Sequence, residues 1–192
     1  MTSLSLKTWS TARSSALDEI ENAHASVGEN ARGRRYATQQ INHAYSVLLS
    51  SQFQGFCRDL HSECVDHLAR SVNPASLESV LRIEFGQNRK VDRGNPNPGN
   101  IGADFNRFGL VFWDDLKAHD ARNTTRRIRL DKLNDWRNAI SHQDFDPAKL
   151  GGTSALRLDT VRSWRQAVHH LAVSFDAVMY AHMNFLAGKP PW

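Results

Sequence analysis

Two residues in the last third of the sequence carry side chains that suit the chemistry of a phosphodiester. Arg137 has a guanidinium, which can bind two non-bridging phosphate oxygens at once. His142 has an imidazole, the side chain that gains and loses a proton near neutral pH. A guanidinium that binds the phosphate and an imidazole that transfers a proton are the smallest set of side chains that could cleave RNA without a metal ion.

The stretch around these residues has the apolar spacing of an amphipathic helix that ends near Pro147. Its apolar positions, two to four residues apart, are Ile128, Leu130, Leu133, Trp136 and Ile140. Because a helix advances about 100° per residue, Asn138 and His142 lie on nearly one line, and Arg137 lies about 140° around from His142. The long stem of Arg137 can cover that angle, so we expect the three polar side chains to meet on a helix anchored in a core.

The spacing Arg137-Asn138-x-x-x-His142 resembles the Arg-x(4 to 6)-His motif of the HEPN superfamily. These are all-helical domains, many of which are metal-independent endoribonucleases, toxins of toxin–antitoxin pairs or abortive-infection effectors. Residues 95–101 followed by 105–110, and residues 48–56, are similar to the RiboL-PSP-HEPN-like branch, so the resemblance covers most of the chain. One position departs from it, since Gln54 stands where that branch often has an acidic residue.

The resemblance implies an active site shared by two protomers across a two-fold axis. In the implied mechanism, a ribose 2′-OH attacks its own phosphate, and His142 acts as general base or acid. Arg137 stabilises the charge on the phosphorane, and Asn138 orients the site or the partner's motif. The products carry a 2′,3′-cyclic phosphate and a 5′-OH, and DNA should resist cleavage because it lacks the 2′-OH. An antitoxin or another regulatory protein is a further implied partner, and no cofactor is expected.

Other candidate RNA-binding residues flank the motif. Net charge of +4 and a pI near 9.3 favour a polyanionic partner. A basic stretch at 122–129 leads into the helix, and we expect Arg126, Arg127 and Arg129 to line an RNA path. Ser141, beside His142, is a fourth candidate. The alternative for the three arginines is a solvated helix start.

Two alternatives to a nuclease stay open. The first is a HEPN-like module that binds RNA or a protein without cutting. Separately, a purely structural interpretation of the motif has Arg137 paired with Asp135 or Asp144 and His142 capping its helix. The second is a metal-dependent protein that uses Cys57, His61, Cys64 and His67. A straight helix spreads these four side chains over too much length for a tetrahedral site. We therefore expect buried thiols beside a solvated histidine edge, and no metal site.

Composition indicates one helical domain, residues 1–192, that is cytoplasmic. The chain is 40% hydrophobic and 23% charged, as in ordinary globular proteins. It has no run of about eighteen apolar residues. Cys57 and Cys64 lie about 10 Å apart along a helix, which is too far for a disulfide.

The apolar spacing predicts an all-α antiparallel bundle of about five to six helices. The first expected helices cover residues 6–27 and 34–71, and a short helix capped by Asn73 ends at Gly86. A loop from Gln87 to Gly102 follows, and then a helix that is capped by Asp104 and includes Leu116. The helix of the motif and a closing helix of about thirty residues from Leu158 complete the bundle. We expect Phe108, Phe112 and Trp113 to be core residues. The closing helix has a seam that suits packing along the bundle or against a second copy.

Overall fold

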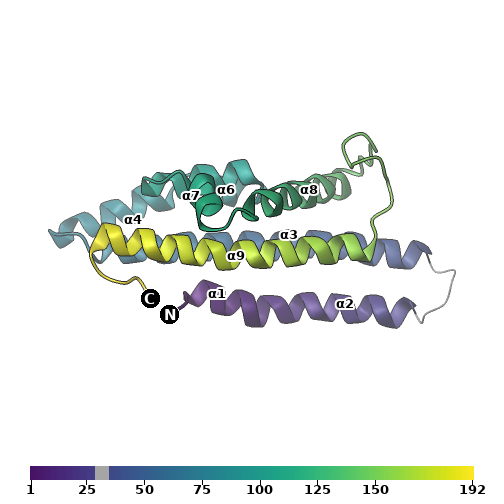
Figure 1. Ribbon diagram of the computed structural model, residues 1–192, viewed down its shortest axis with the longest axis horizontal. Helices are drawn as coiled ribbons and strands as arrows, with labels where there is room; N and C mark the ends of the chain where they lie inside the picture. Colours follow the sequence, from purple (N-terminus) through teal and green to yellow (C-terminus); the bar gives the residue numbers. More distant parts are fainter. Residues whose placement is uncertain (29–34) are drawn as a thin grey trace.

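The computed structural model describes residues 1–28 and 35–192, and within these ranges its regular structure is entirely helical (Figure 1). The all-α prediction is confirmed. The predicted start of the second helix at residue 34 lies outside the described residues. No described helix has both the length and the apolar character that crossing a membrane would require.

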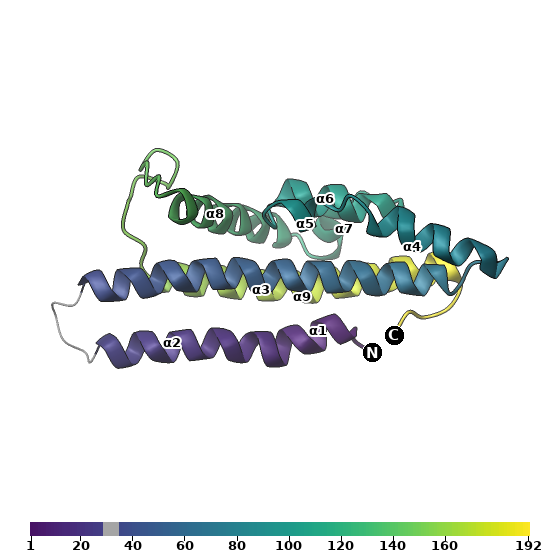
Figure 2. The same ribbon diagram turned by 180° about the vertical axis from the view of Figure 1, so that it is seen from behind.

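The helices form three layers (Figures 1 and 2). The first layer consists of α1 (Leu4–Thr8), a π-helical turn (Trp9–Arg13) and α2 (Ser14–Gly28). The middle layer holds the two longest helices, α3 (Arg35–Ala69) and α9 (Leu158–Ala187), which pack against each other. The third layer contains α4 (Glu78–Gly86), α5 (Lys90–Arg93), α6 (Pro98–Phe105), α7 (Phe112–His119) and α8 (Asn123–His142).

The bundle is only partly antiparallel, because α3 and α9 run in the same direction (Figure 1). At one end, the first residues of the chain bond to both helices: Ser5 N donates to Glu63 at 2.6 Å and Ser3 N to Asp176 at 3.1 Å. Towards the other end, Arg165 of α9 donates to the hydroxyl of Tyr45 of α3 at 3.1 Å. The purely antiparallel arrangement expected from the sequence is therefore wrong for the central pair.

Aromatic rings from four helices form the centre of the core. Phe105 of α6 stacks on Phe112 of α7 with ring centroids 4.5 Å apart, and Phe112 meets Phe175 of α9 edge-on at 4.7 Å. Phe175 also lies 5.8 Å from Phe53 of α3. Such pairs contribute about 0.5–1.5 kcal/mol each beyond their burial. The prediction that Phe108 and Phe112 are core residues is confirmed, and Trp113 packs partly buried against the same cluster.

The predicted loop from Gln87 to Gly102 is wrong, because α5 and the first half of α6 lie within it. Asn97 starts α6: its side chain accepts a hydrogen bond from Asn100 N at 2.8 Å, and Pro98 occupies the first turn. These two helices, together with α7, raise the number of helices above the five to six expected.

Two predicted helix caps are also wrong. Asp104 lies buried inside α6 and does not start the following helix; α6 continues into a 3-10 turn that ends at Gly109, which has a φ of +87°. Asn73 does not cap α4, which is preceded by a 3-10 turn over Ala75–Leu77 without a side-chain cap.

Candidate functional site

Helix α8 carries the three motif residues on its last two turns. Its inward face holds Leu130, Leu133 and Trp136, all at most 3% exposed. The helix ends at His142 because Gln143 adopts a left-handed conformation (φ +55°). The amide of Asp144 then donates back to Ala139 O at 3.0 Å, as in a Schellman-type cap. The end predicted near Pro147 is thus too late.

An aromatic contact fixes the chain just beyond this cap. Phe145 stacks on His43 of α3, with ring centroids 5.2 Å apart and planes 16° apart. His43 is buried, and burial lowers its pKa, so its ring is neutral at physiological pH. The stack ties the segment after His142 to the first turns of α3.

Of the motif residues, Arg137 and Asn138 are in contact near the end of α8. Arg137 is half-buried, and its Nη1 donates to Asn138 Oδ1 at 3.4 Å. Asn138 Oδ1 also accepts a short hydrogen bond from Asn95 Nδ2 in the segment before α6. His142 lies one turn further on and is exposed, as is Ser141. Asn138 therefore sits between the guanidinium and the imidazole.

A shallow hollow of about 240 Å³ lies beside this end of the helix. It is lined by Asp135, Asn138, Ala139, His142, Asp144, Lys149 and Leu150. The Lys149 side chain comes from the segment after α8 and bonds to Asp144 at 2.8 Å. Asn138 and His142 thus line one surface depression, whereas Arg137 does not line it and is linked to it only by its hydrogen bond to Asn138.

Both carboxylates of the hollow are paired with lysines. Lys132 bonds to Asp135 at 3.0 Å. The hydrogen bond and charge of Lys149 lower the pKa of Asp144, with a small contribution from His142. In the described part of the chain, neither Arg137 nor His142 forms an ion pair with a carboxylate. The alternative in which Asp135 or Asp144 pairs with Arg137 does not match this geometry.

Asn134 attaches the segment before α6 to α8. It is 3% exposed, and its Nδ2 donates to Pro96 O at 3.1 Å and to Leu130 O at 2.9 Å. Its Oδ1 accepts from Ser50 of α3 at 3.4 Å. Asn100 Nδ2 holds the same segment from the other side by donating to Asn95 O at 2.8 Å. The asparagines of this stretch therefore position Asn95 against Asn138.

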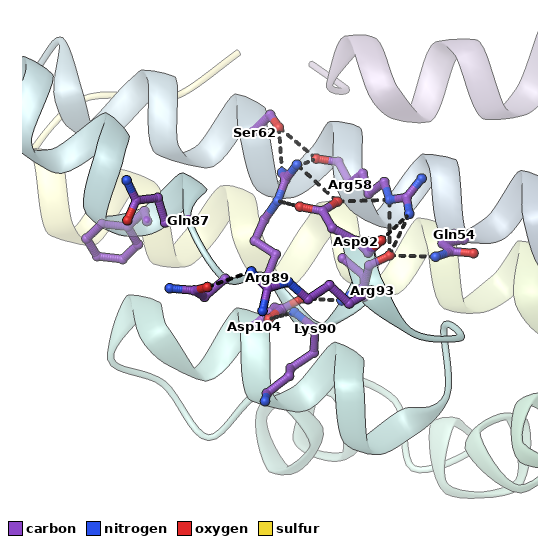
Figure 3. A network of polar contacts seen from close by, with 12 residues as sticks. Gln54, Arg58, Ser62, Gln87, Arg89, Lys90, Asp92, Arg93 and Asp104 are labelled. Carbon is purple, nitrogen blue, oxygen red and sulfur yellow. Dashed lines mark hydrogen bonds and ion pairs between the residues drawn. The ribbon is translucent and has the colours of Figure 1, made fainter.

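A polar network on α3 holds α5 and fixes where this segment begins (Figure 3). Gln54 Nε2 donates to Val91 O at 2.5 Å and to Gly94 O at 2.8 Å, and Arg58 Nη2 donates to Val91 O at 2.8 Å. On the opposite side of α5, the buried carboxylate of Asp104 accepts from the amides of Lys90 and Val91 at 2.7 and 2.9 Å. Asp104 therefore caps α5, and Gln54 acts as a donor that an ionised acid at this position could not replace.

We expect Gln54→Glu to lower the free energy of unfolding by about 2 kcal/mol at pH 7, because a carboxylate would face two carbonyl oxygens. Gln54→Met is the matched control: it loses both hydrogen bonds without adding a charge, and we expect a loss of about 1 kcal/mol. Urea unfolding measures both. The two variants should converge as the pH falls below about 4, where a glutamate with the ordinary pKa of about 4.3 is mostly protonated. Equal stability of the Glu variant and the wild type at pH 7 would contradict this role for Gln54.

The structure separates the three arginines predicted to line an RNA path. Arg126 is 9% exposed and bonds to Asp120 and to Asn123, both at 2.8 Å, so the prediction is wrong for this side chain. Arg127 is exposed on α8 and lies over the ring of Trp113, with its guanidinium carbon 4.9 Å from the ring centroid. Arg129 is exposed on the same helix. Only Arg127 and Arg129 are open to a polyanion.

The cysteine and histidine face of α3 is part of the core. Cys57 and Cys64 are free, buried thiols, and burial raises the pKa of each. Among residues 1–28 and 35–192, no group of three or more potential ligands is arranged to hold a metal ion. The expected solvated histidine edge is wrong for His61, which is fully buried between the rings of Phe105 and Phe108. His182 of α9 lies with its Nε2 2.9 Å from Phe108 O.

Sequence reasoning missed two residues of the site. Asn95 belongs to the stretch 95–101 that carries the resemblance, but its contact with Asn138 is a tertiary one that periodicity cannot predict. Lys149 enters the hollow because the chain turns back after Gln143. The nearby Gly151 and Gly152, which the sequence does mark as a turn, have φ values of +77° and +87°.

Comparison with models of protein families, with curated proteins and with solved structures finds no match to this chain, so the resemblance to the HEPN superfamily rests on the residues quoted above.

Proposed function

We propose that this protein is a metal-independent endoribonuclease of the HEPN type. The observation that carries the proposal is that His142 and Asn138 line one hollow at the exposed end of α8, and that Arg137 donates a hydrogen bond to this Asn138. Neither side chain is engaged by a carboxylate in the described residues, and both acids of the hollow are already bonded to lysines.

The proposed reaction is an internal phosphoryl transfer. The ribose 2′-oxygen forms a bond to the adjacent phosphorus and loses its proton to a general base. The bond from phosphorus to the 5′-oxygen breaks, and that oxygen takes a proton from a general acid. His142 performs one of these proton transfers, and Arg137 stabilises the negative charge on the non-bridging oxygens. Water is not consumed in this step, so the product is a 2′,3′-cyclic phosphate and a 5′-OH.

The geometry suits Arg137 for binding a phosphate. Its single hydrogen bond in the described residues is a long contact of 3.4 Å to a neutral amide, so most of its five donors are open to a ligand. The stem of Arg137 is half-buried beside Asn138, so this side chain has already lost part of its conformational entropy before a substrate binds. The two carboxylates that line the hollow, Asp135 and Asp144, are each paired with a lysine, which leaves the guanidinium of Arg137 without a carboxylate partner in the described residues.

A second copy of the chain would complete the site. In-line transfer needs a base and an acid on opposite sides of the phosphorus, and the hollow offers one imidazole, His142. A homodimer in which two such hollows face each other supplies both groups, in line with what the family resemblance implies. A role as a toxin or antiphage effector, held in check by an antitoxin or another regulatory protein, follows from the same resemblance.

The test is an assay of purified protein on end-labelled single-stranded RNA in EDTA, with DNA of the same sequence beside it. We expect RNA fragments with cyclic phosphate ends and no cleavage of DNA. RNA bound but left intact would overturn the nuclease proposal and favour the alternative, a HEPN-like binding module. Cleavage that stops on chelation would instead point to a bound metal.

A further inference from the structure

A second hollow, of about 500 Å³, lies on the other side of the segment that follows His142. One wall comes from the first turns of α3 and the other from the segment between α8 and α9. Its lining residues are Tyr36, Gln39, Gln40, His43, Phe145, Ser154 and Ala155. Consecutive residues of one segment line the two hollows, since Asp144 faces the first and Phe145 the second. The Cα atoms of Asp144 and Phe145, as consecutive residues, are about 3.8 Å apart, so the two hollows adjoin the same segment of chain.

The second hollow offers flat aromatic surfaces together with amide groups. Tyr36 is 90% exposed, an unusual state for a large aromatic side chain. Phe145 and His43, which also line the hollow, form a stacked pair, and His43 is neutral at physiological pH. The hollow thus contains an unstacked ring at its edge and a fixed stack in its wall.

Gln39 adds a positioned hydrogen-bonding group. Its Nε2 lies 3.2 Å from both Ser154 O and His43 Nε2, which joins the two walls of the hollow. With the donor end of the amide engaged, the oxygen of Gln39 remains as an acceptor. An acceptor beside stacking surfaces suits a planar ligand that carries N–H groups, as the nucleobases do.

We propose that this second hollow binds a nucleobase of the RNA strand whose phosphate lies at Arg137 and His142, with the base stacked on Tyr36. The proposal rests on the proposed ribonuclease function, which supplies the strand. A single-stranded substrate can leave its phosphate on one side of the Asp144–Phe145 segment and turn its neighbouring base to the other side. Recognition of this base would then select which phosphate is cut.

The test measures the affinity of the full protein for a fluorescent 2′-O-methyl RNA hexanucleotide, which cannot be cut because its 2′-oxygen is blocked. We expect Tyr36→Ala to weaken binding by roughly tenfold or more, because one base–aromatic stack is lost. Tyr36→Phe keeps the ring and should bind like the wild type. Phe185→Ala is the matched control, since Phe185 is an aromatic residue on α9, 80% exposed, outside the hollow.

A hexanucleotide series with one abasic position in each member separates base stacking from attraction of the phosphates. The wild type should lose affinity for one abasic position in particular, and Tyr36→Ala should be indifferent to that position. The proposal is overturned if Tyr36→Ala binds no more weakly than Phe185→Ala, or if no abasic position matters. It is also overturned if the hollow binds an apolar peptide in preference to the hexanucleotide.

The outcome is distinguishable from failure of the nuclease proposal. Loss of affinity in Tyr36→Ala, with unmodified RNA left intact by the wild type, would support the base-binding hollow while removing the ribonuclease. If the wild type cleaves RNA but Tyr36→Ala does not change the affinity, the ribonuclease proposal is supported and the base-binding hollow is ruled out.

Discussion

His142→Ala should lower the single-turnover rate of RNA cleavage in EDTA by about 10²- to 10⁴-fold, the usual contribution of one general acid or base. The imidazole lies exposed at the end of α8, so its removal leaves the core intact and the protein should unfold at the wild-type urea concentration. His170→Ala is the matched control, because His170 is an exposed histidine on α9, outside the hollow. We expect it to cut RNA at the wild-type rate.

Substitutions of Arg137 test the other half of the site. Arg137→Ala should be as damaging as His142→Ala, whereas Arg137→Lys keeps the charge but loses the planar fork, and should retain an intermediate rate. Arg129→Ala removes an exposed cation from the same helix and should have little effect beyond weaker binding at low salt. If His142→Ala and Arg137→Ala both cut RNA at the rate of their controls, the site at the end of α8 is not the catalytic one.

The helices with regular apolar spacing were predictable because burial of one face decides their formation. The predicted helix from Leu158 is α9, and the predicted 34–71 helix is α3 apart from its ends. Within α8, however, Ile128 is 58% exposed, although the apolar spacing places it in the buried stripe. Ile128 and Leu130 differ by about 200° around a helix, so they cannot share a face. Angular position, more than recurrence in the sequence, decides which side chains are buried.

Polar residues were harder to assign because their partners are tertiary. Asp104 has the sequence context of a helix cap, and it does cap a helix, but α5 lies before it in the chain and the contact crosses from α6. Arg126 belongs to a basic stretch, yet Asp120 and Asn123 hold it inside. The end of α8 was misplaced because its left-handed residue is Gln143, and only glycine or asparagine would have signalled it.

That Asn138 and His142 line the same hollow could be predicted, because residues four apart lie on one side of a helix. The hollow beside them could not, since it requires the turn of the chain that brings Lys149 back. The same limit applies to the base-binding hollow, where Tyr36 and Phe145 come from segments more than a hundred residues apart in sequence. Local spacing thus predicts which side chains share a helix face, and only the tertiary structure shows what surrounds them.

His61 makes the protein sensitive to acid. It is fully buried, and neither ring nitrogen has a hydrogen-bond partner of normal geometry in the described residues. Burial, aided by the positive charges of Arg89 and Arg107, lowers its pKa from 6.5 to about 3, while the main chain of Asp104 and the charge of Asp92 act weakly in the opposite direction. The folded protein therefore keeps this imidazole neutral under conditions in which the unfolded chain protonates it.

The free energy of unfolding should consequently fall as the pH drops below about 6.5. Above that pH, His61 is neutral in both states and its contribution is complete. Between pH 6.5 and 4 the unfolded chain binds one more proton than the folded protein at this residue, and the loss should reach roughly 3 kcal/mol. Urea unfolding at a series of pH values measures this slope.

His61→Leu should remove this part of the pH dependence. A leucine of similar volume fits among Phe105 and Phe108 without an unpaired polar group, so we expect its stability at pH 7 to equal or exceed that of the wild type. At pH 4 the variant should be more stable than the wild type by roughly 3 kcal/mol. His170→Leu, at an exposed position, should follow the wild-type curve. If the free energies of unfolding of wild type and His61→Leu change in parallel from pH 7 to 4, the buried imidazole does not control acid stability. The two proteins differ only at residue 61, so any effect of its protonation must appear as a difference between their curves.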